Sequence, residues 1–185
     1  MANKIKFGLR NVHYAVITDD GSTFTYATPV RIPGAVSISL TANGEISEFF
    51  ADDITYFSTE ANNGYDGDLD IADLPESFAT DVLGQAISAH GLQVENADSA
   101  IKRFAMTFEV QGDETPRRYV LYNCIATRPT IASNTRGTTI EPQTGTLTIQ
   151  ARAHAYNQNI KANTTATTAP EVFAAWNTAI VEPTA

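Results

Sequence analysis

One stretch of alternating apolar and polar residues constrains the fold more than any other part of the sequence. Its apolar side chains fall at every second position and so share one face of a strand: Phe104, Met106, Phe108 and Val110. The following segment, GDETP at residues 112–116, has turn chemistry, and residues 118–126 are rich in β-forming side chains. The pattern predicts an antiparallel hairpin, so the chain must build an antiparallel sheet.

Length and hydrophobic content fit a single β domain. The chain has 185 residues, of which 43% are hydrophobic, and this is enough to form one core. We expect the domain to span residues 1–156, with a Thr- and Asn-rich linker and a short C-terminal helix or arm at residues 157–185. No apolar run approaches the roughly 18 residues that cross a bilayer, so no membrane insertion is expected.

The chain is acidic, with a formal net charge of −9. Tight binding to nucleic acid relies on Lys and Arg, so this charge disfavours a DNA-binding domain. An acidic surface is nevertheless suited to a wall that DNA passes without adhering.

The first 60 residues predict strands joined by tight turns. Residues 12–18 and 23–27 flank an Asp-Gly turn signal at residues 20–21. Residues 35–41 alternate apolar and hydroxyl side chains, which predicts one buried and one wet face with Val36 on the buried one. Asn43-Gly44 then predicts another hairpin turn.

A second hairpin carries many aromatic side chains. Residues 45–51 and 54–58 enclose Asp52 and Asp53, and they include Phe49, Phe50, Tyr56 and Phe57 in a region with little local core. Two interpretations remain open: the aromatic side chains contact a neighbouring subunit, or they cap the core of their own sandwich.

Two helices are expected beside the strands. Residues 75–89 begin with Pro-Glu, have an apolar stripe and end before His90-Gly91. A short amphipathic helix at residues 170–181 carries Phe173 and Trp176 as candidates for docking. The predicted fold class is therefore mainly β with one central helix, an α+β chain built on an antiparallel sandwich or barrel.

The segment DGDLD at residues 66–70 partly matches a calcium-binding loop. The match fails because Ile71 replaces the required glycine and Ser77 replaces the required glutamate. Asp66, Asp68 and Asp70 alternate with apolar residues, so a strand with one acidic wet face is the favoured interpretation.

No catalytic constellation is apparent. His13, His90 and His154 lack metal-ligand spacing, and nucleophile-elbow, Walker and dinucleotide-binding patterns are absent from the sequence. Cys124 lies mid-strand, where a small buried residue is the ordinary role. We expect no enzyme activity, no cofactor and no metal site.

Basic residues are predicted near one end of the long hairpin, at positions 102–103 and 117–118. They form either a solvated, salt-bridged edge or a surface complementary to acidic residues of another subunit, namely Asp52, Asp53 and residues 66–70. The sequence alone does not separate these two interpretations.

Several short sequence segments, which follow one another over most of the chain, are similar to those of a known protein family. They are GLRNVHYA at residues 8–15, PGAV at 33–36, GYDGDLD at 64–70, LP at 74–75, LYNC at 121–124, RP at 128–129 and IEPQTGTLTI at 140–149. Together they resemble the major tail protein, or tail tube protein, of long-tailed non-contractile bacteriophages of Gram-positive hosts.

The resemblance implies hexameric rings that stack into a tube, with inner sheets joined into a continuous barrel around a DNA channel. It implies a protein made in the host cytoplasm and located in the virion tail, where its partners are other copies, the tape measure protein and the tail terminator and distal tail proteins. DNA would pass without specific binding. On this basis the aromatic hairpin, including Asp52 and Asp53, is the candidate contact between rings, and Asp66, Asp68 and Asp70 are candidates to line the lumen.

Two alternative functions remain. A tube protein of a phage-related secretion system would share the fold and pass effectors instead of DNA. A β-sandwich module that binds cell-wall carbohydrate would explain the acidity and the scattered aromatic residues, and it would act as a monomer.

Overall fold

The computed structural model describes residues 4–135 and 142–183. The predicted domain and arm also include residues 1–3, 136–141 and 184–185, which lie outside the described residues. The strands are β1 (Lys6–Asp19), β2 (Phe24–Tyr26), β3 (Val30–Arg31), β4 (Ala35–Ala42), β5 (Ile46–Ala51), β6 (Ile54–Glu60), β7 (Tyr65–Ile71), β8 (Ala86–Ile87), β9 (Gln93–Val94), β10 (Phe104–Gly112), β11 (Arg117–Ala126), β12 (Gly145–Ala151) and β13 (Lys161–Asn163). The helices are α1 (Glu76–Asp81) and α2 (Pro170–Ala175). The predicted mainly β class is confirmed.

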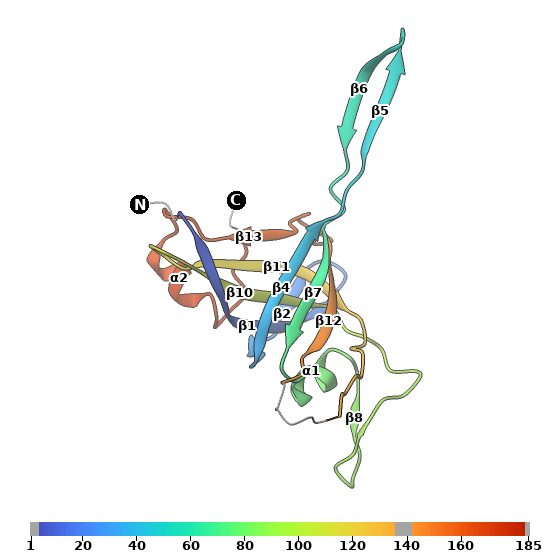
Figure 1. Cartoon of the computed structure of the whole chain (residues 1–185), viewed down its shortest axis with the longest axis vertical. Helices are drawn as coiled ribbons and strands as arrows, with labels where there is room; N and C mark the ends of the chain where they lie inside the picture. The colour runs from blue at the N-terminus through green and yellow to red at the C-terminus, as the bar shows by residue number, and fades with distance from the viewer. Residues whose placement is uncertain (1–3, 136–141, 184–185) are drawn as a thin grey trace.

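One antiparallel sheet organises the molecule. Its main path runs β2-β1-β10-β11-β12-β7-β4, with β3 paired to β1 and β13 paired to β11. The predicted long hairpin is confirmed as β10 and β11, and β1 with β2 forms the predicted N-terminal hairpin. Strands β4, β7 and β12 run steeply across the direction of β10 and β11 (Figure 1). The path therefore bends into two layers that face each other.

The main core lies between these layers. Leu69 on β7 and Ile149 on β12 pack in the same buried cluster as Phe104 and Leu121 of the other layer. Helix α1 adds Phe78, whose ring lies edge-on to Phe104 with centroids 5.4 Å apart. Burial of these large apolar side chains is the main source of stability of the fold.

The predicted helix at residues 75–89 is too long. Helix α1 ends at Asp81, and Gly84 then adopts a left-handed conformation with φ 71°. A Cβ atom at this position would lie 2.6 Å from the carbonyl oxygen of Ala100. The chain turns away there into β8, and Ile87, which lies within the predicted helix, is exposed. A glycine near the middle of the apolar pattern ends the helix.

Two expectations about residues 35–44 are wrong. Strand β4 pairs with β7, not with β5, so Asn43-Gly44 is not a hairpin turn. The backbone N–H of Asn43 donates instead to the carbonyl of Gly64, 2.8 Å away, at the base of the projecting hairpin. Val36 is exposed because the register shifts between Ala35 and Ser37, which interrupts the alternation.

The C-terminal segment is part of the fold. A linker was predicted from residue 157, but β13 pairs with β11 and Thr164 is buried. The linker expectation is therefore wrong at residues 161–164: hydrogen bonds to a central strand organise a segment with little apolar content. Helix α2 occupies the first part of the predicted terminal helix.

Replacing Gly67 tests the close approach of β4 and β7. A Cβ atom on Gly67 would lie 1.8 Å from the Ser39 carbonyl oxygen, so Gly67→Ala must push the strands apart. We expect it to lower the free energy of unfolding by more than about 3 kcal/mol, as for other severe backbone clashes. Urea denaturation measures the effect.

The matched control is Gly145→Ala on the neighbouring strand β12, where the nearest atom to a new Cβ is the Ile71 carbonyl oxygen at 4.0 Å. It should change stability by less than about 0.5 kcal/mol. Equal stability of the two variants would contradict the observed strand spacing.

Candidate assembly surfaces

The described residues form no cluster typical of a metalloenzyme. Within ranges 4–135 and 142–183, no group of three or more His, Cys, Asp and Glu side chains is placed to hold a metal ion. Cys124 is fully buried, and this burial raises the pKa of its thiol. No helix in the same ranges has the length and apolar character to span a membrane. The notable features of these residues are surfaces whose apolar side chains or strand edges have no partner in the described part of the chain.

The first surface is the projecting hairpin formed by β5 and β6. It extends from the end of β4 and β7, away from the rest of the chain (Figure 1). Its strands form a two-stranded sheet of their own, with Phe49 opposite Phe57. Asp52 and Asp53 have φ angles of 53° and 61°, as the two-residue turn of a tight hairpin requires. The predicted pairing around Asp52-Asp53 is confirmed.

Both faces of the projecting hairpin carry aromatic side chains. Phe49 and Phe57 share one face, whereas alternation along β5 places Phe50 on the other; Tyr56 lies at a register shift in β6. These four side chains are between 60% and 73% exposed, so the interpretation that they cap their own core is wrong. Exposed aromatic side chains gathered on one element are typical of an interaction site.

The second surface is the outer face of β7 and its neighbours, here called the carboxylate face. Asp70 accepts hydrogen bonds from the hydroxyls of Ser37 on β4 and Thr146 on β12, each at 2.7 Å. Asp68 accepts one from Thr148, also at 2.7 Å. On the opposite face of β7, Leu69 and Ile71 are buried, so the predicted strand with one acidic wet face is confirmed.

Hydrogen bonds and an ion pair keep the carboxylate face charged. The hydroxyls of Ser37 and Thr146 lower the pKa of Asp70 below its usual value. Arg152, whose Nη1 lies 2.7 Å from an Asp66 oxygen, and then Asn43 lower the pKa of Asp66.

Sequence reasoning found the carboxylates but missed their hydroxyl partners. The available signal was the Ser and Thr residues at every second position of residues 37–41 and 144–148. Two such strands flanking an acidic strand place hydroxyls next to carboxylates.

The expected clustering of residues 102–103 with residues 117–118 is wrong. Lys102 and Arg103 precede β10, whereas Arg117 begins β11 and pairs with Val110 near the other end of β10. Strand direction separates the two pairs by the length of the hairpin. Arg118 is engaged within its own chain, because its Nε lies 2.8 Å from the buried carboxylate of Glu109, which also binds Arg10.

The C-terminal aromatic residues dock on their own sheet. Trp176 is buried against Val120 and Tyr122 of β11, and its Nε1 donates to the Tyr119 carbonyl at 3.4 Å. Phe173 lies under the guanidinium of Arg118, 3.9 Å from the ring centroid. Both candidate docking residues, Phe173 and Trp176, therefore make their contacts within the same chain.

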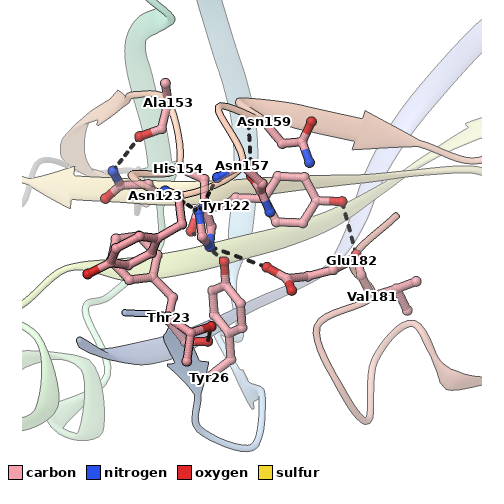
Figure 2. A network of polar contacts seen from close by, with 12 residues as sticks. Thr23, Tyr26, Tyr122, Asn123, Ala153, His154, Asn157, Asn159, Val181 and Glu182 are labelled. Atoms are coloured by element: carbon pink, nitrogen blue, oxygen red, sulfur yellow. Dashed lines mark hydrogen bonds and ion pairs between the residues drawn. The ribbon is translucent and has the colours of Figure 1, made fainter. Parts of the chain in front are cut away.

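A polar network holds the last described residues against the sheet (Figure 2). Tyr122 donates its hydroxyl to the Val181 carbonyl at 2.9 Å. His154 Nδ1 accepts the backbone N–H of Tyr156 at 3.1 Å, which leaves the proton on Nε2, 3.3 Å from a Glu182 oxygen. His154 is therefore a packed structural residue.

The pH dependence of stability tests the carboxylate face. Because the folded-state pKa of Asp70 lies below the ordinary value of 3.8, its ionised form favours folding above that pH. The contribution is lost as pH falls through the folded-state value. We expect Asp70→Asn to flatten the decline of the urea midpoint between about pH 5 and pH 2.

The matched variant Ser37→Ala/Thr146→Ala keeps the carboxylate and removes its donors. It should flatten the same decline, because the pKa of Asp70 then returns toward 3.8. Wild-type slopes in both variants would show that these hydrogen bonds do not couple to folding.

The family model described as phage tail tube protein matches residues 2–181. No curated protein matches the sequence. A solved structure described as the anti-feeding prophage cap, the tube-terminating cap, aligns with a TM-score of 0.49 at 12% identity, covering 90% of this chain and 95% of that one. The match over nearly the whole chain shows that this protein belongs to the phage tail tube protein family.

Proposed function

We propose that the protein forms the tail tube of a long-tailed phage as stacked hexameric rings around a channel through which DNA is ejected into the host. The observation that carries the proposal is the projecting hairpin, whose aromatic side chains are exposed on both faces. Contacts with other copies would bury these side chains and make the element stable. Membership of the phage tail tube protein family indicates that this assembly is part of a phage tail.

The position of the hairpin supports ring stacking. It leaves the body at one end of the long axis (Figure 1), so the two ends of a subunit differ. If the two different ends of a subunit are complementary, subunits contact each other head to tail. Such contacts add ring upon ring and produce an open-ended filament. The hairpin residues assigned to the contact between rings are Phe49, Phe50, Asp52, Asp53, Tyr56 and Phe57.

Side-to-side contact within a ring involves the sheet edge. Among the described strands, β4 ends the main path of the sheet. Its outer backbone N–H and C=O groups are available to a strand from a neighbouring subunit. Pairing around the ring would remove such edges and close the inner sheets into a barrel.

The carboxylate face is assigned to the channel wall. Asp66, Asp68 and Asp70 lie on one face of a strand near the middle of the proposed inner sheet. Net negative charge there repels phosphates, and the cation on this face, Arg152, is paired with Asp66, so DNA passes without specific binding. Hydrogen bonds from the flanking strands hold the carboxylates close to the sheet.

The remaining assignments rest on the family. The protein is made in the host cytoplasm and enters the virion, where its tube surrounds the tape measure protein and meets the terminator and distal tail proteins at its ends. We assign it a structural role, without catalysis or a cofactor.

Removing the hairpin tests this function. Residues 46–60 are replaced with Asn-Gly, which can bridge Glu45 and Ala61 because these residues already share a backbone hydrogen bond of 2.9 Å. We expect a folded monomer, since the hairpin belongs to a separate two-stranded sheet. Electron microscopy and light scattering should show tubes for the wild type and single particles for the deletion.

Point variants separate aromatic contact from hairpin length. Phe49→Ser/Phe57→Ser should raise the protein concentration required for polymerisation by at least about tenfold, as loss of a buried aromatic pair does at interfaces. The control Ser47→Ala/Thr59→Ala alters the same hairpin face and should polymerise normally. Tubes from the deletion variant would contradict the proposal, and a wild-type monomer that bound glycan would favour a carbohydrate-binding module.

A further inference from the structure

A group of cationic and apolar residues lies where β1 begins and β10 turns into β11. Lys6 pairs with Gly112 and Phe7 with Gln111, so the start of β1 lies beside the end of β10. The backbone N–H of Lys4 donates to an Asp113 oxygen 2.9 Å away, which holds the residues before β1 against the turn. We call this surface the basic end; it comprises Lys4, Ile5, Lys6, Phe7, Arg10, Arg117 and Arg118.

The basic end differs in charge from the rest of the protein. It holds five of the 12 Lys and Arg residues in a chain of net charge −9; Arg10 and Arg118 pair with Glu109 of their own chain, which leaves Lys4, Lys6 and Arg117 as the further cations of this surface. Ile5 and Phe7 are 59% and 51% exposed and alternate with Lys4 and Lys6. Strand alternation places Lys6 and Phe7 on opposite faces, so this segment presents an ammonium side and an apolar side, which suits a partner that carries both acidic and apolar side chains.

The projecting hairpin has the matching chemistry. Residues 45–60 contain five acidic residues and neither Lys nor Arg. Glu48 and Glu60 lie on the hairpin face that also carries Ile46 and Phe50, and all four side chains are exposed. The hairpin therefore combines apolar and carboxylate side chains on one face, and the start of β1 combines apolar and ammonium side chains within one short segment.

We propose that the projecting hairpin of one copy docks on the basic end of a second copy. This inference rests on the proposed tube function and names the surface that receives the hairpin. A phosphate-rich ligand would satisfy the ammonium groups and leave Ile5 and Phe7 exposed, whereas the hairpin satisfies both. The hairpin projects away from the basic end of its own chain (Figure 1), so the receiving surface belongs to another copy.

The contact explains one directional feature of assembly. Each copy carries one hairpin and one basic end, at separate places on the molecule, so every contact leaves a free hairpin and a free basic end at the ends of the assembly. This is the geometry of an open-ended polymer. Attraction between opposite charges also sets the register of the contact and excludes contact between two hairpins, which repel each other.

Charge reversal on both sides tests the pairing. Lys4→Glu/Lys6→Glu reverses the basic end, and Glu48→Lys/Glu60→Lys reverses the hairpin; all four side chains are exposed. Each double variant should raise the concentration required for polymerisation by about tenfold or more at low salt. The quadruple variant, which exchanges the two charges, should return to within about threefold of wild type. Sedimentation and electron microscopy measure polymer, and circular dichroism confirms folding.

A charge-matched control reverses residues away from both surfaces. Glu76→Lys/Asp98→Lys changes the net charge as much as the hairpin reversal does, on exposed residues at α1 and the loop after β9. It should polymerise like the wild type. A control as defective as the hairpin reversal would show that net charge, not pairing, governs assembly and would overturn the inference.

The other outcomes are equally decisive. A folded quadruple variant that stays monomeric, while the wild type forms tubes, overturns the pairing and leaves the tube function intact. Wild-type protein that never polymerises overturns both. If Lys4→Glu/Lys6→Glu polymerises normally but loses affinity for a short DNA duplex in a mobility-shift assay, the basic end is a nucleic-acid site and the inference is wrong.

Discussion

The two-residue alternation of β7 is the constraint on which the rest of the structure depends. Leu69 and Ile71 must face the core, so Asp66, Asp68 and Asp70 must face outward together. Three adjacent carboxylates on one strand repel one another. The hydroxyls of β4 and β12 compensate by donating hydrogen bonds to Asp68 and Asp70, and Asn43 and Arg152 bind Asp66. The same strand therefore seals the core and creates a fixed negative surface.

The isolated chain is complete in its core and incomplete at its surface. Helix α2 and the C-terminal network cover one side of β11 within the chain, because Trp176 and Tyr122 find partners there. The projecting hairpin, the outer edge of β4 and the basic end have exposed apolar side chains or unpaired strand edges instead. Such surfaces are unfavourable in a monomer and favourable in an ordered polymer.

Sequence patterns correctly predicted the elements in which local sequence and tertiary packing favour the same secondary structure. The β10–β11 hairpin, the Asp52-Asp53 turn and the alternation of β7 combine strong periodicity with turn residues, and all three are confirmed. The length of α1 was wrong because the apolar stripe continues past Gly84, whose backbone conformation ends the helix. Strand β13 was missed because its order comes from pairing with β11, a distant segment that local composition does not reveal.

The candidate site shows the same division. Aromatic content identified the projecting hairpin, and alternation identified the carboxylate face, since both are local properties. The hydroxyl donors and the basic end depend on which strands become neighbours, as in the pairing of Lys6 with Gly112. Sequence alone placed residues 102–103 beside residues 117–118, and the register separates them. Pairing between distant segments is the information that the sequence patterns lacked.

The most direct test of the proposed tube is a cryo-electron microscopy reconstruction of assembled tubes in which individual strands are traced. We expect the carboxylate face of β4, β7 and β12 to line the channel and each projecting hairpin to lie on another copy of the chain. A channel lined by β10 and β11, with the Asp66–Asp70 side chains on the outside of the tube, would contradict it.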